Sequence, residues 1–169
     1  MKLYHGSNSK FSEFSLDFIG ENAGYTEGAG VYFTPSFETA NRYGSYLYAI
    51  NFTPGRELSD NELTITPKEY YELITIMHTQ HEYLDNYGEV DYEGFNRVLN
   101  KAYESEYLAS SSDSQLLASI GNGCGNHKHI LEIASDILQA THFKGFNFNV
   151  DIYSIFNLKR ITILDIQSK

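Results

Sequence analysis

Two kinds of hydrophobic spacing divide this chain into a middle block and two flanking parts. In residues 59–142 apolar side chains recur every three or four positions, which is the spacing of amphipathic helices. In residues 2–58 and 143–166 the apolar runs are short or alternate with polar residues, as they do in strands. The order strands, helices, strands predicts an α+β fold. A length of 169 residues suits a single domain, residues 1–169, with 59–142 as a mostly helical insertion.

The flanking parts contain the predicted strands. Short strands are predicted at 2–5, 30–33, 47–52, 146–153 and 161–166. Ser36 is placed to cap a helix over 36–43, and Gly44 follows its end. Phe11, Phe14 and Phe18 have the spacing of a single helical turn.

The middle block contains three predicted long helices. They begin at Pro67, at residue 91 and at His129, and the last two end near residues 107 and 141. The glycines between residues 121 and 126 predict a flexible turn before the last helix.

Net charge is −10, and residues 57–113 carry all of the excess, with 13 acidic and 3 basic residues. Proteins that bind long nucleic acids show the opposite, a basic stripe. Two interpretations remain open: a solvated helical surface, or a docking face for a basic partner such as an inhibitor protein. One cysteine and no bilayer-length apolar run favour a cytoplasmic protein without membrane contact.

Two short motifs place chemical groups on early strands. His5 is followed by Gly6 and Ser7, and Gly30 precedes Val31-Tyr32-Phe33-Thr34. Cleaving NAD at its nicotinamide requires a flat pocket for the carboxamide, contacts to the ribose and stabilisation of an oxocarbenium-like transition state. Glycine backbone, histidine and stacking tyrosines provide groups of this kind.

These motifs resemble the ADP-ribosyltransferase superfamily, in the branch with a His-Tyr-Glu triad that includes diphtheria toxin and the poly(ADP-ribose) polymerases. The resemblance implies a split β-sheet core, with His5 at the ribose and the Gly6 backbone at the carboxamide. It also implies that Tyr32 and Tyr43, eleven residues apart, enclose nicotinamide. The implied NAD-binding set is His5, Gly6, Ser7, Tyr32, Phe33 and Tyr43.

The third triad position has two candidates. Aligned strictly from Phe156, the family's Glu falls on Ile152; shifted by one residue, it falls on Asp151. Alternation places Asp151 on one polar face with Asn147 and Asn149, which favours Asp151. The implied catalytic set is then His5, Tyr32 and Asp151. If Ile152 is the equivalent, the chain resembles members that transfer a single ADP-ribose or have lost activity.

The sequence therefore predicts a mono-ADP-ribosyltransferase similar to small bacterial or phage toxins. NAD would be its co-substrate, and a protein or RNA its acceptor. An inhibitor or antitoxin protein would dock on the acidic helical segment. The alternatives are an NAD glycohydrolase and a non-catalytic binding module. No metal is expected, because no Cys or carboxylate joins the histidine pairs 78/81 and 127/129 at ligand spacing.

Overall fold

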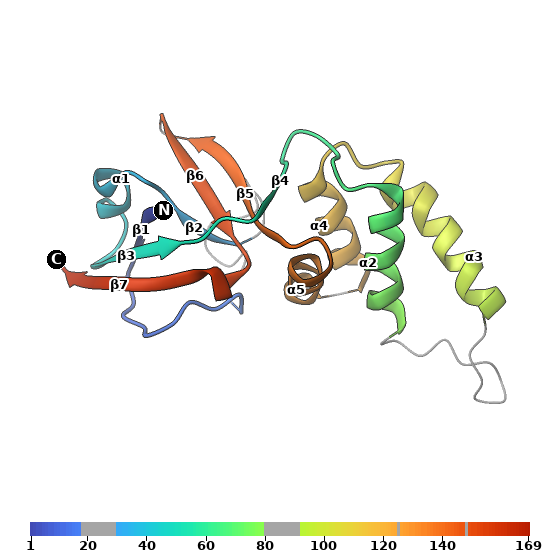
Figure 1. Cartoon of the computed structure of the whole chain (residues 1–169), viewed down its shortest axis with the longest axis horizontal. Coiled ribbons are helices and arrows are strands. Elements are labelled where there is room, and N and C mark those ends of the chain that lie inside the picture. The colour runs from blue at the N-terminus through green and yellow to red at the C-terminus, as the bar shows by residue number, and fades with distance from the viewer. Residues whose placement is uncertain (18–29, 80–91, 125, 148) are drawn as a thin grey trace.

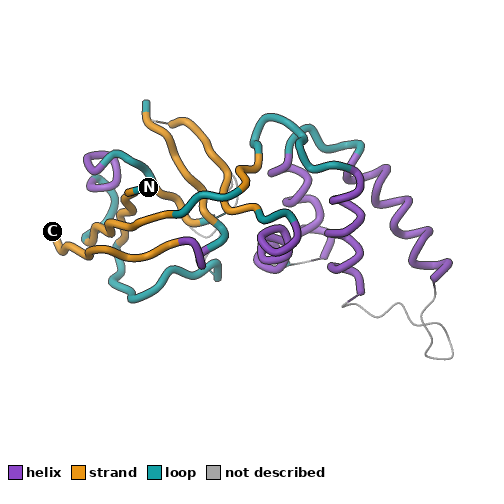
Figure 2. Tube along the Cα trace, in the orientation of Figure 1, coloured by secondary structure: helices purple, strands orange, loops and turns teal. Residues whose placement is uncertain are grey.

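The computed structural model describes residues 1–17, 30–79, 92–124, 126–147 and 149–169. Within these residues the fold is α+β, with two sheets and five α-helices. The sheets and α1 (Phe37–Asn41) occupy one end of the molecule, and α2 to α5 form a helical block at the other (Figure 1). Figure 2 shows that loops and short strands connect the two parts. The predicted order of strands, helices and strands is confirmed.

The first sheet has three antiparallel strands in the order β1-β3-β7. These are β1 (Lys2–Ser7), β3 (Tyr46–Phe52) and β7 (Ile161–Ser168). The second sheet has the order β2-β6-β5-β4. Its strands are β2 (Val31–Phe33), β6 (Val150–Ile155), β5 (Ala140–Asn147) and β4 (Arg56–Leu58), with only β4 and β5 parallel.

The two sheets join where β1 meets the end of β2. Tyr4 N–H donates to the Thr34 carbonyl at 2.8 Å, and Thr34 N–H donates to the Tyr4 carbonyl at 3.0 Å. Apolar side chains from both sheets pack against each other beside this bridge. They are Leu3, Phe33, Ile50, Phe52, Tyr153 and Ile155. The join therefore holds the two sequence motifs next to each other.

The helical block consists of α2 (Pro67–Thr79), α3 (Tyr92–Ala102), α4 (Asp113–Cys124) and α5 (His127–Ile137). A π-helical turn, Tyr103–Tyr107, follows α3. The block has its own core, to which Tyr70, Leu73, Leu116 and Ile130 contribute fully buried side chains.

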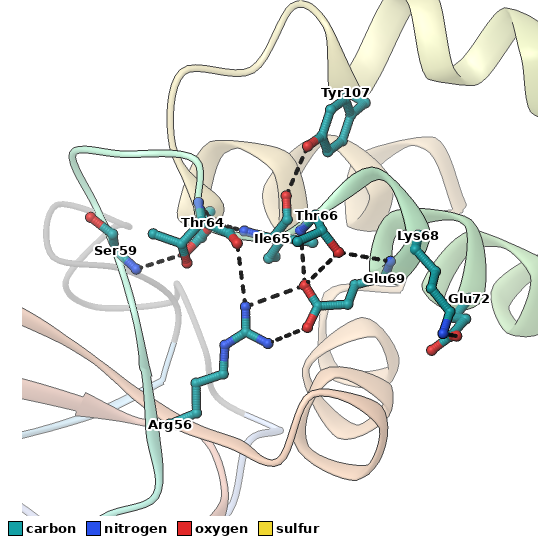
Figure 3. A network of polar contacts seen from close by, with 10 residues as sticks. Arg56, Ser59, Thr64, Ile65, Thr66, Lys68, Glu69, Glu72 and Tyr107 are labelled. Atoms are coloured by element: carbon teal, nitrogen blue, oxygen red, sulfur yellow. Dashed lines mark hydrogen bonds and ion pairs between the residues drawn. The ribbon is translucent and has the colours of Figure 1, made fainter.

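The start of α2 is fixed by a reciprocal cap. Thr66 Oγ1 accepts from Glu69 N–H at 3.3 Å, and Glu69 Oε2 accepts from Thr66 N–H at 2.8 Å. Pro67 stands between them at the first helical position, where its missing N–H costs nothing. Arg56, on β4, donates to both Glu69 oxygens at 2.5 and 3.4 Å, which ties the helical block to the second sheet (Figure 3).

Asp113, at the start of α4, binds the segment between β4 and α2. Its side chain is fully buried. The carboxylate accepts from Ser59 N–H at 2.9 Å, from Thr64 N–H and Oγ1 at 2.6 Å each, and from Ile65 N–H at 2.9 Å. One side chain therefore satisfies three backbone donors of the segment that links β4 to α2.

The structure confirms several sequence predictions. Ser36 caps α1 by accepting from Thr39 N–H at 3.1 Å, although α1 ends at Asn41 rather than near residue 43. Pro67 begins α2, and β2, β3 and β7 lie where strands were predicted.

Other predictions are wrong. Residues 121–124 belong to α4 rather than to a flexible turn. The last helix ends at Ile137, and Gln139, with φ of 54°, leads directly into β5. In place of the single strand predicted over 146–153, β5 ends at Asn147 and β6 begins at Val150, and the two pair antiparallel, with Asn149 left-handed at φ 60°. Phe11 and Phe14 are not helical. Phe18 and His81 lie outside the described residues.

Candidate functional site

In the described residues β1 and β2 share a single bridge, Tyr4–Thr34, and the two motifs meet beside it, at the place called below the opening between β1 and β2. His5 Nδ1 lies 2.8 Å from the Tyr32 carbonyl oxygen. A carbonyl can only accept, so Nδ1 carries the proton, and in the neutral ring Nε2 presents a lone pair. The family resemblance implies that His5 and Tyr32 lie at one site, and the structure brings them together.

Aromatic rings from β2, β3 and the segment after β1 surround the His5 ring. Ring centroids of Phe14, Phe33, Tyr48 and Phe11 lie 5.4, 5.4, 6.1 and 6.3 Å away. Burial lowers the pKa of His5, and the hydrogen bond to Tyr32 opposes this effect only in part. His5 is therefore neutral near pH 7.

Gly6 lies on the opposite face of β1, directly beneath the end of α1. A Cβ at this position would be less than 3.0 Å from the carbonyl oxygens of Ala40 and Tyr43. Gly44, with φ of 67°, lies equally close to the Ser7 backbone. Glycine at both positions lets α1 rest on β1, and this contact places Tyr43 beside Gly6.

The backbone of Gly6 points toward the opening. In an antiparallel pair the N–H and C=O groups of successive residues point to alternate sides. Tyr4 uses its pair on Thr34, so Gly6, two residues later, directs its N–H and C=O toward the same side. A primary carboxamide offers the complementary acceptor and donor.

Tyr32 and Tyr43 lie on the face that carries α1. Phe33 is buried between the sheets, so the adjacent Tyr32 projects to the other face, where it is partly exposed. Tyr43 is 49% exposed. Ser7 Oγ accepts from Ser9 N–H at 3.1 Å. Two members of the predicted NAD-binding set therefore have structural roles: Phe33 packs in the core, and Ser7 stabilises the turn after β1.

Asp151 is not brought to Tyr32. Ser154 pairs with Tyr32, and Asp151 lies three residues further along β6, about 10 Å away. Strand alternation puts Asp151 on the inner face with Tyr153, whereas Ile152 shares the face of Ser154 and Tyr32. The Asp151 carboxylate lies 3.0 Å from Lys144 Nζ, and its side chain is 38% exposed.

Next to Asp151 is a polar cluster that sequence reasoning missed. His142 is 3% exposed, its Nε2 lies 3.4 Å from Glu57, and its ring stacks on Tyr153 at 5.5 Å. Lys144 Nζ lies 5.6 Å from the Tyr153 ring. Burial lowers the pKa of His142, while Glu57 acts in the opposite direction. Alternation of His142, Lys144 and Phe146 was the available signal, but residues up to 141 were predicted to be helical.

No group of three or more His, Cys, Asp or Glu side chains among the described residues is arranged to hold a metal ion. No helix in this part of the chain has the length and apolar character needed to cross a bilayer.

Comparisons with known proteins give little guidance. No protein-family model and no curated protein matches the chain. A crystal structure of an anti-CRISPR protein is similar at a TM-score of 0.42 and 16% sequence identity, over 97% of this chain and 95% of that one. A likeness of this size defines neither the fold family nor the function.

Proposed function

We propose that this protein is an NAD-dependent mono-ADP-ribosyltransferase of the toxin type, acting in the cytoplasm, with its two sheets as the transferase core. The observation that carries the proposal is the hydrogen bond between His5 Nδ1 and the Tyr32 carbonyl, which joins two motifs 27 residues apart. The resemblance requires these two residues at one site.

The opening between β1 and β2 is suited to the nicotinamide end of NAD. The N–H and C=O of Gly6 would pair with the carboxamide, as another strand would pair with β1. Tyr32 and Tyr43 would stack on the ring. Neutral His5 would accept a hydrogen bond from a ribose hydroxyl through Nε2, because its Nδ1 proton is already committed to Tyr32.

In the reaction, the bond between ribose C1′ and the nicotinamide nitrogen breaks, and its electron pair leaves with nicotinamide. A nucleophile on the acceptor then forms a bond to C1′ and loses its proton. Ile152, 8% exposed, occupies the face of Tyr32 where the family's Glu would be expected. This arrangement favours transfer of one ADP-ribose over chain building. Asp151, on the opposite face and paired with Lys144, takes no part in this step.

A non-catalytic NAD-binding module is the second candidate, and an NAD glycohydrolase the third. The contact of Asp151 with Lys144, on the face opposite Tyr32, favours the module. In that case NAD would bind without being cleaved. The acidic segment, residues 57–113, would offer a basic inhibitor its docking face in either case.

The test is incubation with adenine-labelled NAD and cell extract, followed by separate analysis of protein and RNA. Label on a macromolecule supports transfer. Free ADP-ribose alone identifies a glycohydrolase, and NAD binding without cleavage identifies a module. Tyr43→Ala should lower labelling at least tenfold. Phe37→Ala is the matched control, because Phe37 is a comparably exposed ring on the adjacent helix, at 45%.

A further inference from the structure

The segment that follows β1 carries two of the rings around His5. Residues 9–14 form neither helix nor strand. Phe11 and Phe14 nevertheless lie 5.0 Å apart and pack against His5, with ring centroids at 6.3 and 5.4 Å. An irregular segment lacks the internal hydrogen bonds of a helix or strand, so its backbone groups need partners elsewhere.

Tyr48, in β3, provides these partners. Its side chain is fully buried. The hydroxyl oxygen accepts from Phe11 N–H at 2.7 Å, and the hydroxyl donates toward the carbonyl oxygens of Ser9 and Phe11, both at 3.3 Å. In the described part of the chain, the hydrogen bonds of residues 10–14 all go to this one hydroxyl.

The ring of Tyr48 extends the same contact to His5. It stacks on Phe11 with centroids 4.3 Å apart and planes 10° apart, and its centroid lies 5.4 Å from that of Phe14. His5 pairs with Tyr48 across β1 and β3, and their rings are 6.1 Å apart. The hydroxyl therefore anchors the segment whose two rings lie against the half-buried His5.

We propose that Tyr48 is a positioning residue: its hydroxyl holds residues 9–14 in place, and the rings of this segment thereby hold His5 in the orientation that contacts ribose. The contact with ribose rests on the proposed transferase function. A phenylalanine at position 48 would keep the stack on Phe11 but would leave the Phe11 N–H without its acceptor. Stacking alone does not require a tyrosine, so the hydroxyl is the group that the segment needs.

The described groups packed against His5 are a carbonyl, phenyl rings and one phenol, and none of them is a charged side chain. They are the Tyr32 carbonyl, Phe33, Tyr48, Phe11 and Phe14. Burial among them lowers the pKa of His5 from 6.5. When the segment moves away, water reaches the ring and the pKa returns toward this value. Once protonated, Nε2 donates and no longer accepts from a ribose hydroxyl.

The test compares Tyr48→Phe with Tyr46→Phe by NMR of the full-length protein without NAD. Tyr46 lies two residues earlier on the same face of β3, and its hydroxyl makes no hydrogen bond within the described residues. Tyr48→Phe should raise the pKa of His5 toward 6.5 and speed amide hydrogen exchange at Phe11 about tenfold. Tyr46→Phe should leave both unchanged.

Phe14→Ala is the second variant, because it removes a ring against His5 and keeps the Tyr48 hydroxyl. It should raise the pKa of His5 while exchange at Phe11 stays slow. An unchanged titration of His5 in folded Tyr48→Phe, or unchanged exchange at Phe11, would overturn the proposal. An unchanged titration in Phe14→Ala would do the same, and this variant decides where Tyr48→Phe does not fold.

Nicotinamide release separates the positioning role from the proposed function. In Tyr48→Phe, kcat/KM should fall about fivefold, and further as the pH is lowered from about 8 to about 6, with Tyr46→Phe close to wild type. No release by wild type would refute the transferase and with it the contact with ribose, while the titration would still show whether Tyr48 holds the His5 ring. Wild-type kcat/KM in Tyr48→Phe, despite a shifted His5 titration, would overturn the positioning role.

Discussion

Replacing Gly6 by alanine tests whether the contact between β1 and α1 is as close as the structure indicates. The new Cβ would lie less than 3.0 Å from two backbone carbonyl oxygens, those of Ala40 and Tyr43. Backbone cannot move aside as a flexible side chain can, so α1 must shift away from β1. Overpacking of this kind costs roughly 1–3 kcal/mol. For a chain of this size each kcal/mol lowers Tm by about 2–4 °C, so a decrease of roughly 2–12 °C is expected.

The assay is thermal unfolding followed by circular dichroism, with Gly123→Ala as the matched control. Gly123 lies in α4, and among the described residues a Cβ there would meet only Glu106 Oε1, at 3.4 Å. Alanine favours a helix over glycine by up to about 1 kcal/mol, so the control should be unchanged or more stable. Equal Tm values for Gly6→Ala and wild type would refute the packing described here.

Three further predictions concern stability. Asp113→Ala leaves three backbone N–H groups without their acceptor and should cost about 3 kcal/mol or more, measured as the midpoint of urea unfolding. Thr66→Ala removes the cap of α2 and should cost about 1 kcal/mol in the same assay, while Thr162→Ala, exposed on β7, should cost less. Burial lowers the pKa of His5 and of His142 in the folded chain, whereas the same histidines in the unfolded chain have the ordinary value of 6.5. As the pH falls through 6.5, the unfolded chain therefore takes up protons before the folded chain does. Stability should therefore fall between pH 7 and 5.5, and less steeply in His142→Gln; an identical slope in the variant would contradict the assignment.

Local signals in the sequence were sufficient for much of the fold. Ser36 three residues before Thr39 predicted the cap of α1, and Pro67 predicted the start of α2. Both features depend on residues close together in the chain. That His5 and Tyr32, 27 residues apart, lie at one site was implied by the family resemblance rather than by local spacing.

The features that sequence reasoning missed depend on long-range packing. Residues 140–147 join the second sheet because β4 and β6 flank them, which the helical spacing before them does not reveal. Asn149 adopts a left-handed turn, so the alternation of residues 146–153 does not continue through it. The polar face predicted for Asn147, Asn149 and Asp151 therefore does not exist as one strand face.

Nicotinamide release from NAD, measured by mass spectrometry for wild type and Tyr43→Ala in the presence of cell extract, tests the central claim most directly. The proposed transferase predicts release by wild type and at least tenfold less by Tyr43→Ala, with Phe37→Ala close to wild type. No release by correctly folded wild type, or equal release by all three proteins, would contradict it.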